Sequence, residues 1–149
     1  MFSVRMVPHH LQAVEMADLV PSRSTNPDVV ALGQRIKEAQ SGEVEQMTRW
    51  LGAWGADPAL GHDELEDQAS HEGADGMVAP ADLRELGALR GPAFDRRWLQ
   101  LMVRHHEGAV AMAQEVLRTG RDAATHDLAR RVIASQQVQI EQMRAMLAR

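Results

Sequence analysis

The sequence contains no cysteine and few aromatic residues, and both shortages exclude broad classes of protein. Without cysteine the chain has no disulfides, no zinc–thiolate sites and no iron–sulfur clusters. Aromatic side chains make up 3% of the 149 residues, and no sustained alternation of apolar and polar residues indicates strands. Ala, Leu, Met, Gln and Glu are plentiful instead, and this bias favours helices.

Excess positive charge and long apolar runs are also missing. The net charge of −5 argues against a nucleic-acid partner held by phosphate contacts. No apolar run approaches the length of a membrane span, and the first ten residues lack the apolar core of a signal peptide. Hydrophobic residues still reach 44%, so we expect one globular domain over residues 1–149 with a single core.

A segment with two adjacent histidines occurs twice, ninety-six residues apart. The first copy reads MVPHHLQAVEMA at residues 6–17, and the second reads MVRHHEGAVAMA at residues 102–113. The same offset keeps aligning matching residues over roughly fifty positions without an insertion, as at Glu45-Gln46-Met47 and Glu141-Gln142-Met143. This register predicts an internal duplication.

The predicted domain therefore consists of repeat one at 1–54, a connector at 55–91 and repeat two at 92–149. The second histidine segment is preceded by GPAFDRRWLQL, whereas only five residues precede the first segment. We expect that residues upstream of the first copy have been lost, either because a targeting segment was removed or because this sequence starts downstream of the natural beginning of the chain.

Each repeat is expected to form two helices. The first helix is predicted over residues 2–20 and ends at Pro21, because proline cannot continue a helix interior. The second is predicted from Asp28, as its cap, to Trp54. The second repeat predicts helices over residues 92–119, ended by Gly120, and over residues 123–148. A short helix is expected at residues 80–89. Two such hairpins predict an all-α, antiparallel four-helix bundle.

The repeated segments carry a soft set of metal ligands. On a helical wheel their histidines and methionines fall on one stripe together with small alanines. Thioether sulfur and imidazole nitrogen together favour copper-like ions over iron or magnesium. The candidate ligands are Met6, His9, His10, Met16, Met102, His105, His106 and Met112. Because imidazole must be neutral to bind a metal, binding is expected to weaken as the pH falls through the histidine range.

Iron oxidation is disfavoured by the same ligands. Di-iron bundles use a Glu three residues before each metal-binding His, and here Met6 and Met102 occupy those positions before His9 and His105. Gln40 and Gln136 are expected to orient a histidine through a buried hydrogen bond. His62, His71 and Met77 lie in an acidic connector, and His126 lies near a helix start, where a surface position is expected.

These residues resemble a known family. The segments HHLQAVEMA and FDRRWLQLMVRHHEGAVAMA, followed by Q-x-x-x-I-E-Q-M-x-x-M-L, are similar to domain of unknown function 305, which includes CopM-like copper-binding proteins. The resemblance covers nearly the whole chain and implies a ferritin-like bundle that bacteria export to the periplasm or exterior. It also implies binding of Cu(I), Cu(II) or Ag(I) by the eight candidate ligands in metal homeostasis or resistance, although the connector here carries fewer Met and His than in many copper-binding members.

The sequence thus predicts a bundle that binds copper, with silver as a surrogate, and that catalyses no reaction. Two other hypotheses about function remain open. One is a metal-dependent enzyme, such as an oxidase, that uses the same histidines. The other is a structural or interaction module, including a homodimer, whose histidines satisfy one another in the core.

Overall fold

The computed structural model describes residues 2–55 and 75–149, and these residues are helical with no strand. The helices are α1 (Phe2–Asp18), α2 (Val20–Arg23), α3 (Pro27–Ala53), α5 (Pro80–Ala88), α6 (Gly91–Thr119) and α7 (Ala123–Leu147). The four long helices match the four predicted ones to within about two residues at each end. The prediction of an all-α four-helix bundle is confirmed.

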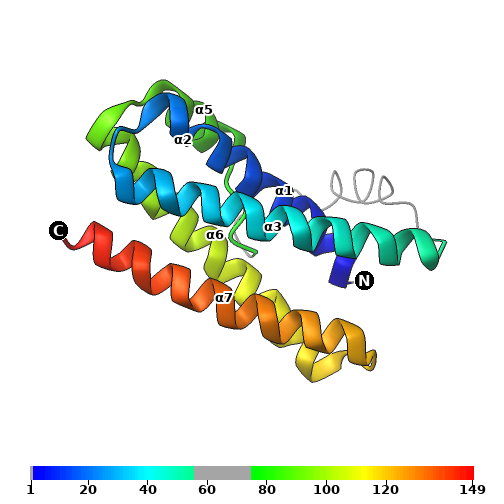
Figure 1. Cartoon of the computed structure of the whole chain (residues 1–149). Helices are drawn as coiled ribbons and strands as arrows, with labels where there is room; N and C mark the ends of the chain where they lie inside the picture. Colours follow the sequence, from blue (N-terminus) through cyan, green and yellow to red (C-terminus); the bar gives the residue numbers. More distant parts are fainter. Residues whose placement is uncertain (1, 56–74) are drawn as a thin grey trace.

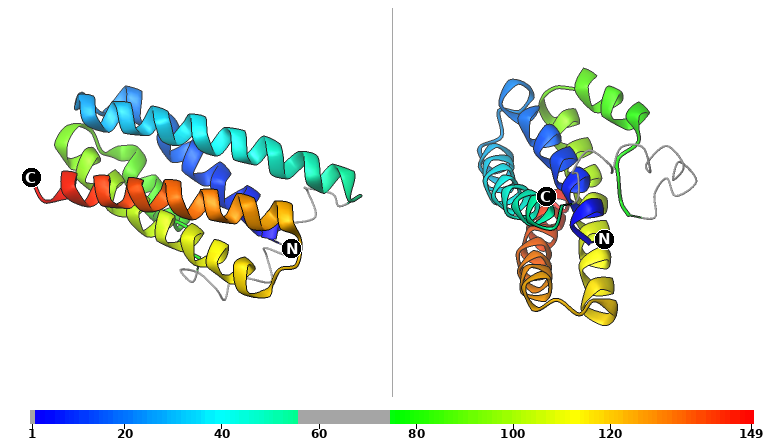
Figure 2. Two further views of the ribbon diagram at one scale, coloured as in Figure 1. Left: turned by 60° about the horizontal axis from the view of Figure 1, so that its bottom comes forward. Right: turned by 90° about the vertical axis from the view of Figure 1, so that its right-hand side faces the viewer.

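The long helices form two hairpins that pack together (Figure 1). Helix α1 lies along α3, and α6 lies along α7, while α1 and α6 make the main contact between the hairpins. In the right-hand view of Figure 2, α3 lies above α7, and α6 extends over the height of both. Helix α5 lies outside the bundle beside α2, where Arg23 donates to the Gly87 carbonyl oxygen at 3.0 Å. The side chains at the α1–α6 contact therefore form most of the interface between the two hairpins.

Polar side chains begin the second helix of each hairpin. The Asn26 side chain accepts a hydrogen bond from the Asp28 backbone N–H, and Pro27 then occupies the first turn of α3. Asp122 plays the same part for α7, since its carboxylate accepts from the Thr125 N–H at 2.7 Å. The expectation that Asp28 caps α3 is thus wrong. Asn26 is the N-cap, and Asp28 lies within the first turn of the helix.

The predicted end of the first helix is also wrong. Helix α1 ends at Asp18, and Pro21 lies in the first turn of the short helix α2. Proline is tolerated there because first-turn N–H groups have no partner within their helix. Pro21 therefore starts a new helical turn after α1.

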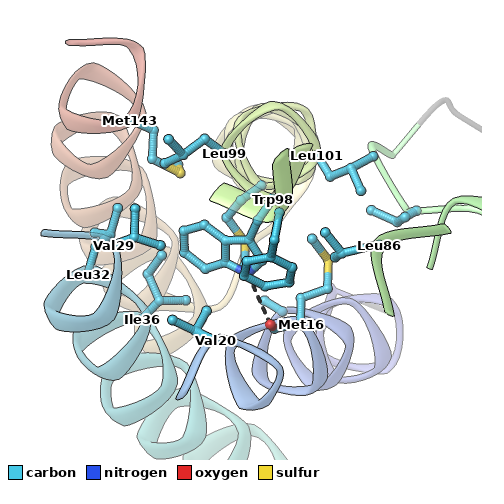
Figure 3. Packing of buried hydrophobic residues seen from close by; sticks show 14 of the residues in the cluster. Met16, Val20, Val29, Leu32, Ile36, Leu86, Trp98, Leu99, Leu101 and Met143 are labelled. Atoms are coloured by element: carbon cyan, nitrogen blue, oxygen red, sulfur yellow. Dashed lines mark hydrogen bonds between the residues drawn. The ribbon is translucent and has the colours of Figure 1, made fainter. Parts of the chain in front are cut away.

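Apolar residues gather in two clusters along the bundle. The first contains Trp98, which is fully buried and donates from its indole N–H to the Met16 carbonyl oxygen at 2.9 Å (Figure 3). Leu32 and Ile36 of α3 pack around it. The second cluster contains Leu128 and Val132 of α7 with Leu51 of α3. Both clusters draw on both hairpins, so burial of their side chains holds the bundle together.

Two hydrogen bonds on the surface connect the hairpins reciprocally. Arg35 of α3 donates to Gln142 of α7 at 3.3 Å, and Arg131 of α7 donates to Gln46 of α3 at 3.2 Å. An offset of ninety-six residues converts each pair into the other. This exchange is the pattern that a two-fold axis between two similar units produces.

The connector contributes the expected short helix, which spans Pro80–Ala88. His62 and His71 lie outside the described residues, and Met77 is exposed. None of the described helices has both the length and the apolar composition needed to cross a membrane.

Truncating one leucine in either cluster is expected to destabilise the protein substantially. Leu32→Ala and Leu128→Ala each remove a fully buried side chain and should lower the free energy of unfolding by about 2–5 kcal/mol. Val138→Ala on α7 is the control, because Val138 is 64% exposed and its loss should change that free energy by no more than about 0.5 kcal/mol. Urea denaturation followed by circular dichroism measures all three. Equal effects of Leu128→Ala and Val138→Ala would contradict the described core.

Candidate metal-binding site

All four histidines of the repeated segments lie inside the bundle where α1 meets α6. His9, His10, His105 and His106 are each at most 1% exposed. The rings of His9 and His105, which are equivalent under the offset, stack on each other with centroids 3.7 Å apart and planes 30° from parallel. The helical stripe predicted from the sequence thus brings both histidine pairs into one buried layer.

His10 and His106 point back into their own hairpins. The Nε2 atom of His10 lies 2.7 Å from a carboxylate oxygen of Glu43 on α3. The Nε2 atom of His106 lies 2.8 Å from the side-chain oxygen of Gln139 on α7. Both partners follow their histidine by thirty-three residues. Glu43 and Gln139 were not among the expected functional residues, although their shared spacing from the histidines is a signal visible in the sequence.

The expected role of Gln40 and Gln136 is wrong. Both side chains are buried, but neither hydrogen bonds to a histidine, and their amide atoms have no partner among the described residues. Each lies three residues before the true partner of the histidine, almost one helical turn away. An error of one turn is typical of placing contacts from helical spacing alone.

His9 is held by the strap, which we define as residues 75–78. Its Nε2 atom lies 2.8 Å from the backbone carbonyl oxygen of Asp75. Since a carbonyl only accepts, Nε2 carries the proton and donates it. Gln12 fixes the strap by donating to the Val78 carbonyl at 2.9 Å and accepting from the Val78 N–H at 2.8 Å. Arg5 also forms an ion pair with the Asp75 carboxylate at 2.7 Å.

Glycine allows the strap to approach α6 closely. A Cβ atom at Gly108 would overlap the Asp75 carbonyl oxygen, and one at Gly76 would overlap the carbonyl oxygen of Arg104. Gly76 also has a φ of 72°, which side chains disfavour. The strap therefore covers the His9 side of the layer only because these two positions lack side chains.

Five ring nitrogens of the four layer histidines make no hydrogen bond of normal geometry. They are the Nδ1 atoms of His9, His10 and His106 and both nitrogens of His105. A buried polar group without a partner costs about 1–3 kcal/mol. Five such groups in one layer are therefore unusual. An unprotonated imidazole nitrogen is a metal ligand, so a bound ion would satisfy those of these atoms that carry no hydrogen, which for His105 is one of its two nitrogens.

Burial favours the neutral form of three of these histidines, His9, His105 and His106. Burial, with a smaller contribution from the neighbouring His10, lowers the pKa of His9 to about 3. It also lowers the pKa of His106 to about 4, although the hydrogen bond with Gln139 opposes this effect. For His105, burial and the nearby His9 together place the pKa well below its usual range. Neutral rings retain the lone pairs that a metal ion requires.

Methionine sulfurs lie on both sides of the histidine layer. Met6 and Met112 belong to one apolar cluster, whereas Met16 and Met102 belong to the other. Each cluster also contains a methionine from the second helix of a hairpin, Met47 in one case and Met143 in the other. The predicted thioethers are therefore divided into two groups that flank the imidazoles. Met47 and Met143 were not among the candidates.

Apart from Glu43, carboxylates contribute little to this layer. Within residues 2–55 and 75–149, no group of three or more His, Asp or Glu side chains is arranged to hold a metal ion. Glu107, next to His106, is exposed and pairs with Arg144. A metal site built from these histidines must therefore include thioether sulfur or use few imidazoles, and that ligand set suits a soft ion of low coordination number.

The remaining histidine of the described chain lies away from this layer. His126 near the start of α7 is half-buried, so the expectation of a surface position is wrong. Its Nε2 atom is close to Gly120, which ends α6. A half-open cavity of about 410 Å³ lies at this end of the bundle, and Met112 and Trp54 form part of its wall.

The whole chain matches one family. The sequence profile of the family described as Domain of unknown function (DUF305) matches residues 1–147. The chain belongs to the DUF305 family. Among proteins with curated descriptions, none matches it.

Solved DUF305 structures share the fold. A DUF305 protein from Streptomyces coelicolor, whose description proposes that it is secreted, is 31% identical with a TM-score of 0.85. The comparison covers 99% of this chain and 90% of that chain. A DUF305 fragment from Deinococcus radiodurans is 30% identical with a TM-score of 0.84, over 99% and 93% of the two chains. CopM in its Cu(I)-bound form is 26% identical with a TM-score of 0.77, over 97% and 91%.

The buried neutral histidines of this DUF305 protein are expected to make its stability depend on pH. Unfolded histidine takes up a proton near pH 6.5, whereas the buried rings stay neutral to about pH 3 or 4. Unfolding therefore takes up protons as the pH falls below 6.5, and each such ring lowers the free energy of unfolding by about 2 kcal/mol at pH 5.

Urea denaturation at pH 7.5 and pH 5 measures this loss. His105→Leu removes one of these rings, so its loss between the two pH values should be smaller than that of the wild type. His126→Ala should keep the wild-type loss, because no buried ring of the layer is removed. A free energy of unfolding that is the same at both pH values would show that the rings are not buried in neutral form.

Gly108→Ala is expected to displace the strap, because the new methyl group would occupy the position of the Asp75 carbonyl oxygen. The Val78 N–H, which bonds to Gln12, should then exchange with solvent at least about tenfold faster. Gly42→Ala on α3 is the control, since a Cβ atom there meets nothing within 4 Å. Hydrogen exchange followed by NMR gives both rates. Unchanged protection of Val78 in Gly108→Ala would refute the close approach.

Proposed function

We propose that this DUF305 protein binds a soft metal ion, Cu(I) or Cu(II), with Ag(I) as a surrogate, between α1 and α6. The observation that carries the proposal is the group of five buried ring nitrogens without partners, flanked on both sides by methionines. Neutral imidazole and thioether are the ligands that copper-like ions prefer over harder ions. The ligands come from the eight residues Met6, His9, His10, Met16, Met102, His105, His106 and Met112.

The similar structures support this proposal through their ligands. CopM has been solved in Cu(I)-bound, Cu(II)-bound and Ag-bound forms as well as without metal. It is 25–26% identical to this chain in these forms, with TM-scores of 0.74–0.77. Because CopM has the same bundle and binds these ions, its similarity to this chain supports metal binding here.

Among the histidines, His105 has the greatest capacity to bind. Neither of its ring nitrogens is hydrogen bonded, whereas His9, His10 and His106 each use Nε2 for a contact within the protein. The latter three would bind through Nδ1. Because the pKa values of His9 and His106 lie near 3 and 4, the weakening by protons that the sequence predicts should begin well below pH 6 in the folded protein.

We infer a role in copper homeostasis or resistance, by sequestering the ion outside the bacterial cytoplasm. The description of the Streptomyces coelicolor protein, which proposes secretion, supports this location. We also infer that the chain is one domain of two duplicated hairpins, residues 1–54 and 92–149, joined by a connector at 55–91. The reciprocal hydrogen bonds of Arg35 and Arg131 support that organisation.

A purely structural role for the histidines is the second candidate. The stacking of His9 on His105 and the near-complete burial of all four rings favour it, since no ring faces the solvent. The two candidates differ in one measurable respect, because a structural layer takes up no ion.

Anaerobic titration with Cu(I) against a competing chelator is the test, and Ag(I) serves as a redox-inert check. We expect the wild type to bind and the double variant His105→Ala/His106→Ala to lose at least about tenfold in affinity. His126→Ala, which changes a histidine remote from the layer, should bind like the wild type. Circular dichroism establishes that the variants are folded. A folded wild-type protein that takes up neither ion at neutral pH would contradict metal binding and would support the structural role.

A further inference from the structure

The two halves of the histidine layer differ at one contact. His10 and His106 occupy equivalent positions, and each directs Nε2 to an oxygen atom thirty-three residues later, at 2.7 and 2.8 Å. The partner of His10 is the carboxylate of Glu43, whereas the partner of His106 is the amide of Gln139. The contacts have the same geometry, but their partners have different hydrogen-bonding capacity.

A carboxylate and an amide restrict a histidine to different degrees. An ionised carboxylate has no proton to donate, so Glu43 accepts only, and Nε2 of His10 must carry the hydrogen. In the neutral ring, the Nδ1 atom of His10 then holds a lone pair. An amide can accept through oxygen or, turned over, donate through nitrogen. Gln139 therefore permits His106 to carry its hydrogen on Nε2 or on Nδ1.

The charge of the two partners differs as well. Glu43 has a side chain that is only 17% exposed, so its negative charge acts through an environment poor in water. A soft monovalent ion held by neutral imidazole and thioether keeps its positive charge, and a carboxylate hydrogen bonded to one of the ligands compensates it. A carboxylate behind an imidazole also raises the basicity of the ligand nitrogen. Gln139 supplies neither effect.

We propose that Glu43 and Gln139 are positioning residues that make the two halves of the site unequal. Glu43 commits His10 to the form with hydrogen on Nε2 and makes Nδ1 of His10 the stronger ligand, so the first ion binds on that side. Gln139 allows His106 to carry its hydrogen on either ring nitrogen. The Nδ1 atom of His106 is a ligand only when the hydrogen is on Nε2. This inference rests on the proposed function for its metal-binding part, whereas the hydrogen positions stand independently of any metal.

The hydrogen positions can be measured in the metal-free protein. Two-bond ¹H–¹⁵N correlation spectra of the imidazole rings at neutral pH distinguish hydrogen on Nε2 from hydrogen on Nδ1. We expect only the Nε2 form for His10 and a mixture for His106. Glu43→Gln should give His10 a mixture, and Gln139→Glu should convert His106 to the Nε2 form alone. Hydrogen on Nδ1 of His10 in the wild type, or spectra that neither substitution changes, would overturn the proposal.

Titration with Ag(I) tests the consequence for binding. Glu43→Gln should weaken binding of the first ion by about tenfold, and Gln139→Glu should strengthen binding on the His106 side. Glu38→Gln is the matched control, because it removes the same charge from an exposed position of α3 and should leave affinity unchanged.

The two proposals fail in different ways. A wild-type protein that takes up no Ag(I) contradicts the proposed function, and the metal-free spectra still decide the hydrogen positions. A wild-type protein that binds Ag(I) with the same affinity as Glu43→Gln contradicts the unequal halves while the proposed function stands. Equal losses in Glu43→Gln and Glu38→Gln would show a general effect of charge and would also overturn the positioning role.

Discussion

The burial of four imidazoles at the crossing of α1 and α6 is the constraint on which the rest of the structure depends. A charged His9, His105 or His106 in this place would lose its hydration without gaining a sufficient partner, so burial favours their neutral rings. Neutral rings still carry a donor and an acceptor each, and the surroundings supply acceptors for three of them through Asp75, Glu43 and Gln139. The atoms that stay without partners are those that a ligand could use.

This constraint also explains why the apolar core is divided. The polar layer separates one cluster around Trp98 from another around Leu128, and each cluster receives methionines from both hairpins. Methionine is suited to such a boundary, because its sulfur is polarisable and its side chain fills irregular space. The same side chains can therefore pack as core residues in the metal-free protein and offer sulfur to an ion.

The layer is not symmetric, although the positions that form it are equivalent. The strap reaches His9 and leaves its counterpart His105 without a hydrogen bond. A single connector between two hairpins can cover only one side of the crossing, and Gly108 provides the space for it there. The position equivalent to Gly108 in α1 is Gln12, whose side chain instead binds the strap at Val78. One chain thus uses two equivalent helix positions in different ways.

The sequence alone determined the four long helices, their pairing into hairpins and the inward direction of the histidine stripe, because helical periodicity and the ninety-six-residue offset can both be read from the residue pattern without any knowledge of packing. It did not determine which polar residue meets which ring. Helical spacing indicated Gln40 and Gln136, whereas the residues that contact His10 and His106 are Glu43 and Gln139, almost one turn further on. Only tertiary structure decided this, since the rotation and translation of α3 against α1 depend on how all their side chains pack. The stacking of His9 on His105 and the contact with Asp75 join segments far apart in the chain, and no local spacing records such contacts.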